Sequence, residues 1–316
     1  MDVAIVRKPT ESLARCLLTH VERGEIDLER AVEQHTAYTA CLRELGCEIV
    51  ELAPLPECPD AVFVEDAAVV LDDVAVIAHP GAPSRRAECA SVARELAKHR
   101  ATVALAEPAA SDALPSLDRA ATLGGHVPGG CHAPLGGHAP LGGPTPLGGH
   151  APLAGHASLG ARAMLDGGDV MAVDHTLYVG QSGRTNHAGL KALAHLVLEH
   201  GYRVKAVDVR GALHLKSACT HLGRGVLLVN RDWIAPERLA PFELVDVDPR
   251  EPFAANSTRV GERVVMSSAY PRTAERVERA GFDVYQVDLS EFHKAEGGAT
   301  CLSLVFPARS TLRTLT

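Results

Sequence analysis

The sequence predicts an α/β fold, and two observations support this. Short runs of aliphatic and β-branched residues, typical of buried strands, alternate with segments whose apolar residues recur at three- and four-residue spacing, typical of amphipathic helices. The order strand, strand, helix, strand returns several times along the 316 residues, which indicates repeated units. Because 46% of the residues are hydrophobic, the chain can bury a large core, in one big domain or two modest ones.

The strands are predicted from residues that favour extended backbone. In chain order they cover 3–7, 47–52, 61–71, 74–78, 169–173, 176–180, 203–209, 225–230, 263–267, 283–288 and 301–306. Four helices are predicted at 28–45, 84–99, 187–200 and 272–280. In the third of these, LKALAHLVLEH places its leucines on one face, so that this helix can pack against a sheet. Periodicity gives the class but not the arrangement of the units.

Segment 109–162 departs from this pattern, because it is rich in glycine, proline and histidine. From Gly124 to Leu159 it reads as six hexapeptides, five of which carry a histidine. Hexapeptide repeats can form a left-handed β-helix, but a proline in nearly every unit and room for only about two coils oppose that reading. We expect a disordered surface insertion, since glycine and proline raise the cost of ordering without supplying a core. No physiological metal site is expected there.

Composition excludes several classes of partner. The formal net charge of -8 argues against nucleic acid and anionic membranes, which need clustered lysine and arginine. No apolar run approaches the length of a membrane span. Eight cysteines occur without a C-x-x-C pair or a signal peptide, which predicts free thiols and a cytoplasmic protein.

Acidic residues gather in PDAVFVED, residues 59–66. Strands usually exclude acids from buried positions, so Asp60, Glu65 and Asp66 could each lie at an exposed strand end. Three acids within seven residues make a cation site the alternative. A second acidic motif, LDGGDVM, sets two glycines between Asp166 and Asp169, which indicates a tight turn or a place where backbone must clear a ligand.

Two arginines stand where a loop meets a predicted helix. They are Arg85 in GAPSRRAE and Arg184 in GQSGRTN. The planar fork of arginine suits a carboxylate, although an arginine in such a place is more often a solvated surface residue.

One histidine and one cysteine can each be read in two ways. His214, between two leucines in ALHLKSACTHL, is either a core residue or a general acid and base with a pKa near working pH. Cys301, in GGATCLSLVF, is either a small core residue at a strand start or a nucleophile. In the second reading, Gly297 and Gly298 let the chain turn so that the thiol faces a ligand.

Eight motifs together resemble one family, the dimethylarginine dimethylaminohydrolases. In order they are SLARCL, PDAVFVED, PGAPSRR, LDGGD, GRTN, LHLKS, AYPRT and GGATCLSL. The similarity runs from residue 3 to residue 306 and is interrupted only by the insertion. It implies a pentein α/β-propeller, in which five ββαβ units surround a central channel that holds the active site. It also implies that residues 1–316 form a single catalytic domain.

The resemblance further implies an activity and a set of site residues. The substrate would be an Nω-methylated arginine (asymmetric dimethylarginine or monomethylarginine), cleaved to citrulline and dimethylamine or methylamine without cofactor or metal. Cys301 would attack the guanidinium carbon to give a thiouronium, His214 would carry protons, and Asp166 would orient His214 and bind the guanidinium. The remaining substrate contacts implied by the motifs are Leu17, Asp60, Glu65, Asp66, Arg85, Arg184 and Ala295. Leu17 and Ala295 would act through their backbone carbonyls.

Other readings stay open. An arginine deiminase or an amidinotransferase of the same fold is the nearest alternative, although deiminases carry H-L-D and F-T-R-D where this chain has HLKS and FVED. A non-catalytic amino-acid or metal binder on the same scaffold is another. The sequence leaves the oligomeric state open, a homodimer included.

Overall fold

Five three-stranded sheets make up the part of the chain that the structure, a computed structural model, describes, residues 1–106 and 162–308. The strands are β1 (Asp2–Arg7), β2 (Cys47–Leu52), β3 (Ala68–Val70), β4 (Val74–Ile77), β5 (Ala101–Ala104), β6 (Val170–Val173), β7 (Thr176–Gln181), β8 (Arg203–Asp208), β9 (Cys219–Gly223), β10 (Val226–Val229), β11 (Glu243–Asp246), β12 (Thr258–Val260), β13 (Arg263–Ser267), β14 (Asp283–Val287) and β15 (Ser303–Pro307). The α-helices are α1 (Leu28–Glu44), α2 (Cys89–Leu96), α3 (His187–Leu198), α4 (Leu215–Ala218), α5 (Pro271–Arg279) and α6 (Ser290–His293).

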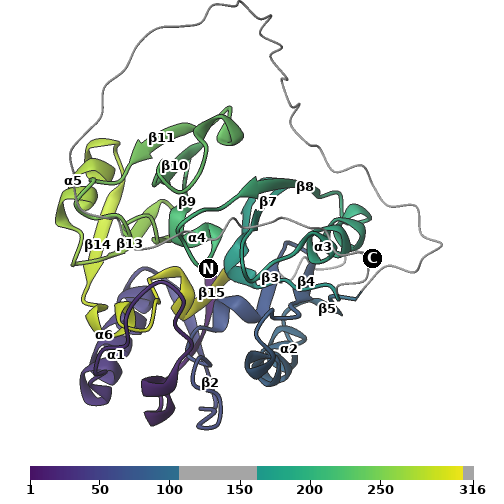
Figure 1. The fold of residues 1–316 in the computed structure, drawn as a ribbon, viewed down its shortest axis with the longest axis horizontal. Helices are drawn as coiled ribbons and strands as arrows, with labels where there is room; N and C mark the ends of the chain where they lie inside the picture. The colour runs from purple at the N-terminus through teal and green to yellow at the C-terminus, as the bar shows by residue number, and fades with distance from the viewer. Residues whose placement is uncertain (107–161, 309–316) are drawn as a thin grey trace, which may run out of the picture.

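All five sheets share one topology. The first strand of each pairs antiparallel with the second, and the second pairs parallel with the third, as β6, β7 and β8 do. A parallel pair needs a crossover connection, and in four units this is a helix: α1, α2, α3 or α5. Figure 1 shows these helices on the outside of the ring. The five-unit pentein architecture implied by the resemblance is therefore confirmed.

One sheet joins the two ends of the described chain. Its first strand is β15, which pairs antiparallel with β1, and β1 pairs parallel with β2. The ladder places Ala4 opposite Val305, and the residues of β1 after Asp2 are all buried. The C-terminal strand thus completes the N-terminal unit and closes the ring (Figure 1).

The fourth unit departs from the ββαβ pattern. Between β10 and β11 the chain forms only a short 3₁₀ turn, Pro236–Leu239, in place of an α-helix. The segment reads DWIAPERLAP, and prolines lack the backbone N–H that a helix interior needs. Only four of the five units are therefore covered by a helix of more than one turn in the described chain.

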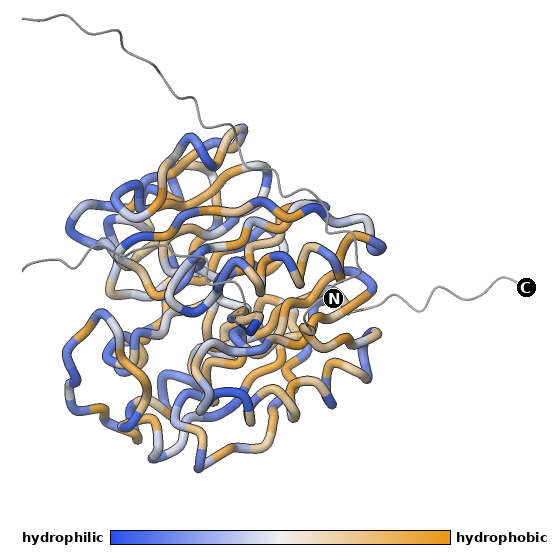
Figure 2. The backbone as a smooth tube through the Cα atoms, turned by 45° about the vertical axis from the view of Figure 1, so that its right-hand side comes forward, coloured by the Kyte–Doolittle hydropathy of each residue, from blue (hydrophilic) through white to orange (hydrophobic). Residues whose placement is uncertain are grey.

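The core lies between each sheet and its helix, and between neighbouring units. In the cluster around α1, Tyr38 and Leu42 pack with Val265 of the fifth unit. In the cluster around α3, Leu190 and Leu193 pack with side chains of the second and third sheets. Figure 2 shows apolar residues along the inner strands and hydrophilic residues on many outer loops. Contacts across unit boundaries fix the ring and thereby the channel.

Several sequence predictions need correction. Of the strand expected at 61–71, only Ala68–Val70 is extended, because Val64–Ala67 forms a 3₁₀ turn. The strand expected at 301–306 begins at Ser303, and the helix expected at 84–99 begins as a 3₁₀ turn, Pro83–Glu88. Four short strands were not predicted: β5, β9, β11 and β12.

The predicted insertion, 109–162, lies outside the described residues except for Arg162. Its disorder, and the single domain spanning 1–316, stay predictions. None of the helices in the described segments combines the length and apolarity needed to cross a membrane.

Candidate active site

Five side chains converge from equivalent places in the five units. Each stands in the short segment before the first strand of its sheet, which is β3, β6, β9, β12 or β15. In that order the residues are Asp66, Asp166, His214, Asn256 and Cys301. The repeated fold thus gathers two acids, an imidazole, an amide and a thiol, although up to 235 positions separate them in the chain.

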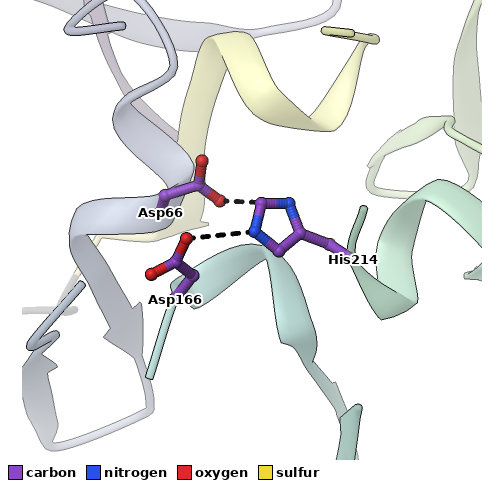
Figure 3. A group of neighbouring side chains, drawn as sticks. All are labelled: Asp66, Asp166 and His214. Carbon is purple, nitrogen blue, oxygen red and sulfur yellow. Dashed lines mark hydrogen bonds and ion pairs between the residues drawn. The ribbon is translucent and has the colours of Figure 1, made fainter. Parts of the chain in front are cut away.

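His214 lies between two carboxylates (Figure 3). Its Nε2 is 3.1 Å from Oδ2 of Asp166, and its Nδ1 is 3.8 Å from Oδ1 of Asp66. Burial alone would lower the pKa of His214, but the charges of Asp66, Asp166 and Asp169 outweigh it and raise that pKa to about 9. The imidazole is therefore protonated at neutral pH and is ready to act as an acid.

The paired glycines of LDGGD allow this approach. A Cβ on Gly168 would lie 2.5 Å from Oδ1 of Asp66 and 2.8 Å from Nδ1 of His214. The backbone N–H of Gly168 donates to the same Asp66 oxygen at 3.1 Å. Glycine is needed here because backbone must clear two site side chains.

Asp166 and Asp169 are both fully buried and held by hydrogen bonds. Oδ1 of Asp166 accepts from the N–H of Gly81 at 3.0 Å, which leaves Oδ2 facing His214. Asp169 accepts from the hydroxyl of Ser182 at 2.6 Å and from the N–H of Leu215 at 2.9 Å. Burial raises the pKa of Asp169 to about 6. The hydrogen bond from the N–H of Leu215 fixes the backbone next to His214, so Asp169 helps to position the imidazole.

Asp66 is the carboxylate with the strongest positive surroundings. Burial alone would raise its pKa, yet the charges of His214 and Arg85 lower that pKa to about 2. Arg85 pairs with Oδ2 of Asp66 through Nη1 and with Glu88 through Nη2, at 2.8 Å in the second case. Asp66 thus stays ionised at all physiological pH values.

The two arginines that are predicted to bind a carboxylate differ in how far their N–H groups are already hydrogen-bonded within the protein. Arg85 also donates from Nη2 to the backbone carbonyls of Asp60 and Phe63, at 3.1 and 3.0 Å, so most of its N–H groups are engaged within the described chain. The side chain of Arg184 is 13% exposed, and its Nη1 lies 3.9 Å from Oδ2 of Asp166. Both arginines line the cavity that holds His214 and Cys301. Arg184 is the more available of the two for a ligand.

Cys301 lies in a 3₁₀ turn, Thr300–Leu302, and is 8% exposed. Its Sγ accepts from the N–H of Gly298 at 3.4 Å and from Nδ2 of Asn256 at 3.5 Å. Burial, with the negative charges of Glu65 and Asp66, raises the pKa of Cys301 to about 12. The resting residue is therefore a thiol, held by two N–H donors that would also stabilise a thiolate.

The glycines before Cys301 serve close approach. A Cβ on Gly297 would lie 2.3 Å from the ring of Phe63, and one on Gly298 would lie 2.4 Å from the side-chain amide of Asn256. The residue with left-handed backbone is Glu296, with φ of 58°. The glycines thus make room for Phe63 and Asn256, and the left-handed residue of the turn is Glu296; that the glycines also let the chain turn stays a prediction.

One small cavity connects most of the predicted residues. It measures about 20 Å³, and both Cys301 and His214 line it. The other predicted residues in its lining are Leu17, Asp60, Asp66, Arg85, Arg184 and Ala295. Asp60 accepts from the N–H of Leu17 at 3.0 Å, and burial raises the pKa of this carboxyl. Two predicted residues are not in this lining, the fully buried Asp166 and Glu65.

Glu65 points away from this cavity, although it precedes Asp66 in the same turn. Its Oε1 lies 2.7 Å from Nζ of Lys216, and its Oε2 accepts from the hydroxyl of Thr300 at 2.7 Å. Together these three residues line a separate cavity. A direct contact between Glu65 and substrate stays a prediction, which requires the pair with Lys216 to open.

Comparisons with known proteins agree with this geometry. No family model matches the chain. Over 301 residues it is 36% identical to N(G),N(G)-dimethylarginine dimethylaminohydrolase of Streptomyces coelicolor, covering 95% of both chains. Over 302 residues it is 30% identical to the protein of that name from Pseudomonas aeruginosa, covering 96% of this chain and 98% of the other.

A solved structure points the same way. A variant of the Pseudomonas aeruginosa protein with serine in place of a cysteine, complexed with citrulline, matches with a TM-score of 0.75 and 29% identity, over 96% of this chain and 98% of that chain. The chain belongs to the dimethylarginine dimethylaminohydrolase family. It is therefore a member of a class of hydrolases that act on C–N bonds, and the resemblance in its motifs is confirmed.

Three further residues of the site are not predicted from the sequence. Asn256 holds Cys301, Lys216 neutralises Glu65, and Glu296 fixes a loop at the cavity rim. One oxygen of Glu296, Oε1, accepts from the N–H groups of Thr19, His20 and Val21. A signal existed for Asn256, because it stands where the fifth unit should supply a residue.

A cation could in principle bind between three of these residues. Donor atoms of Asp66, Asp166 and His214 lie within 4.8 Å of one another. However, Asp66 is already paired with Arg85, and His214 is protonated below a pH of about 9. These positive groups compete with a metal ion for the same carboxylates.

Proposed function

We propose that this protein hydrolyses Nω-methylated arginines to citrulline and methylamine or dimethylamine, with Cys301 as the nucleophile. The observation that carries the proposal is that Cys301 and His214 line one cavity together with the carboxylates of Asp60 and Asp66. A guanidinium is resonance-stabilised and resists attack by water, so a covalent route through sulfur is a chemical advantage. That a citrulline complex exists for a cysteine-to-serine variant of a related protein supports the same reading.

Substrate binding is proposed to use opposite charges at the two ends of the molecule. Asp60 and Asp66 bind the guanidinium, and Asp166 binds it from the side of His214. Arg184 and Arg85 bind the α-carboxylate, each charged hydrogen bond contributing roughly 1.5–3 kcal/mol. The carbonyls of Leu17 and Ala295, which both line the cavity, accept from the α-ammonium.

Binding also generates the nucleophile. The pKa of about 12 at Cys301 and of about 9 at His214 mean that both are protonated in the free enzyme at neutral pH. A guanidinium placed beside the sulfur offsets the charges of Glu65 and Asp66, so it lowers the pKa of the thiol. The thiol proton leaves to solvent, because His214 already carries its own.

The chemical steps then follow from the protonation state of His214. The thiolate attacks the guanidinium carbon, and the imidazolium gives its proton to the departing amine as the C–N bond breaks. The neutral imidazole next takes a proton from water, which attacks the thiouronium carbon. Breaking the C–S bond releases citrulline and returns the sulfur. Asp166, at 3.1 Å from Nε2, keeps the ring oriented throughout.

Citrulline formation from separate incubations with asymmetric dimethylarginine and with arginine tests the proposal. We expect kcat/KM to be higher for the methylated substrate. Faster turnover of arginine would identify a deiminase instead. Mass spectrometry of a trapped adduct should map the added mass to Cys301, and mapping to another residue would overturn the nucleophile assignment. A cytoplasmic location and a homodimer remain predictions.

A further inference from the structure

A second cavity adjoins the reaction site and has a different chemical character. It measures about 210 Å³, against about 20 Å³ for the cavity that holds Cys301. We name it the annex. The side chains that give it its character are Val21, Leu213, Ser217, Phe253, Tyr270 and His293. No lysine or arginine is among the described residues of its lining, and its one carboxylate, Glu296, is engaged with the loop at 19–21.

The annex is continuous with the site through shared walls. Leu213, Glu296 and Gly297 line both cavities. Asn256 and Gly298, the two groups that donate to Sγ of Cys301, also line the annex. On the other side, Leu213 directly precedes His214 in the chain, and Ser217 follows it by three residues. The annex therefore begins beside the sulfur and the proton donor, which are the groups proposed to act on the departing nitrogen.

The far end of the annex is aromatic and open. The rings of Tyr270 and His293 stack with centroids 5.2 Å apart and an interplanar angle of 23°. Phe253, which packs on Trp233 with ring centroids 5.0 Å apart, is 43% exposed. Such walls stabilise apolar groups and carry no charge to pair with a guanidinium or a carboxylate.

We propose that the annex binds the alkyl substituent on the departing nitrogen, and that this enzyme accepts Nω-alkylarginines with substituents larger than methyl. The inference rests on the proposed function, since it concerns the same reaction. A cavity needs only about 10–15 Å³ to hold one water, so about 210 Å³ leaves room for several carbon atoms. The bond broken is still that between the guanidinium carbon and the substituted nitrogen. That nitrogen takes the proton of His214 and leaves as the alkylamine, while water supplies the oxygen of citrulline.

The experiment compares kcat/KM for Nω-methyl-, Nω-propyl- and Nω-benzylarginine in the wild type and in Ser217→Leu. We expect the wild-type values for the larger substrates to lie within about tenfold of the value for the methyl substrate, whereas a pocket too small for one added methylene would lower them by roughly 10–200-fold. Ser217→Leu fills the annex from a half-buried position outside the catalytic set. It should lower propyl and benzyl turnover at least about tenfold relative to methyl. Thr36→Leu, on an exposed position of α1, is the matched control and should change no ratio.

Three outcomes count against the annex. They are a wild type that cleaves methylarginine but cleaves propylarginine more than about tenfold worse, a Ser217→Leu enzyme that loses all substrates equally, and a Thr36→Leu enzyme that behaves like Ser217→Leu. If Ser217→Leu fails to fold, Phe253→Ala replaces it. That variant widens the open end, so the benzyl-to-methyl ratio should rise, and an unchanged ratio overturns the inference. Absence of turnover with every methylated arginine would instead refute the proposed function.

Discussion

Two neighbouring carboxylates, Glu65 and Asp66, lie on one 3₁₀ turn, but their pKa values are shifted in opposite directions. Asp66 faces His214 and Arg85, and its pKa is lowered to about 2. Glu65 faces Lys216 and Thr300, and burial raises its pKa. A turn with about three residues per revolution directs successive side chains well apart. Asp66 therefore lies in the reaction cavity, whereas Glu65 points away from it. The difference teaches that acid content alone cannot assign a substrate contact.

Replacing the proposed nucleophile, Cys301, in the cavity that Asp66 lines should have the largest effect on activity. Cys301→Ser is expected to lower kcat at least about a thousandfold, because a serine hydroxyl is a far weaker nucleophile at neutral pH. The fold should persist, since the change is nearly isosteric. Citrulline assays and thermal unfolding check both statements. The control is Cys41→Ser, a half-buried thiol outside the cavity, which should stay active. Retained activity in Cys301→Ser would contradict the mechanism.

His214→Gln comes next, with an expected loss of about 10²–10⁴ in kcat from removal of the proton carrier. A substrate whose leaving group needs no proton, such as S-methylthiocitrulline, should lose less. The matched control is His221→Gln, which lies outside the cavity. Equal losses for both substrates would argue that His214 only shapes the site.

The pH dependence of the same histidine has a definite sign. The folded pKa of about 9 lies above the ordinary value of 6.5, so its stabilising contribution is complete below pH 6.5 and is lost as pH rises through about 9. Proton donation to the amine fails over the same upper range. We expect wild-type stability to fall between about pH 6.5 and about pH 9, kcat for asymmetric dimethylarginine to fall as the pH passes about 9, and the stability loss to shrink in His214→Gln. Urea titrations at several pH values measure it, and an unchanged loss would reject this assignment.

Removing the ion pair between Lys216 and Glu65 should affect the stability of the protein more than its activity. Lys216→Met leaves Glu65 buried without its cation, which is expected to reduce the free energy of unfolding by about 3 kcal/mol. The double variant Glu65→Gln/Lys216→Met should recover most of that loss, because no uncompensated charge remains. Denaturant unfolding compares the three proteins. A double variant as unstable as Lys216→Met would show that the pair itself is not what matters.

The smallest expected effect is a change in the pKa of Cys301, which both carboxylates raise. Glu65 contributes to the raised pKa of Cys301, so Glu65→Gln should lower that pKa. The rate of thiol alkylation as a function of pH reports the shift, with Cys301→Ser giving the background. A shift to higher pH would have the wrong sign and would contradict the charge argument.

Much of the fold and part of the site could be predicted from sequence, for identifiable reasons. Buried strands such as β13 carry a continuous apolar run, Val264–Met266, and the predicted bounds of 263–267 are confirmed. The strands that are not predicted, such as CTHLG in β9, mix polar and apolar residues; Thr220 and His221 of β9 line the separate cavity that also holds Glu65. Segment 61–67 looked like a strand because valine and phenylalanine dominate it, yet it is tied down by Arg85 and Gly168 from elsewhere in the chain.

The site shows the same division. Asp166 and His214 could be singled out by their motifs, but their 3.1 Å approach depends on the packing of two units. Asn256 lacks any local signal, since asparagine beside serine and threonine is typical of an ordinary turn. Glu65 points away from the reaction cavity because it pairs with Lys216, which lies 151 positions later in the chain. Contacts of that kind are tertiary facts.

The pairing of β15 with β1 has a consequence for how the protein matures. Cys301, the proposed nucleophile, lies just before the last strand of the ring, so it reaches its place only after translation has passed that strand. A nascent chain halted earlier would hold four complete sheets and an N-terminal sheet without β15, with Asp66, Asp166 and His214 already made but without Cys301 beside them. The proposed site is thus complete only once the C-terminal strand pairs with β1.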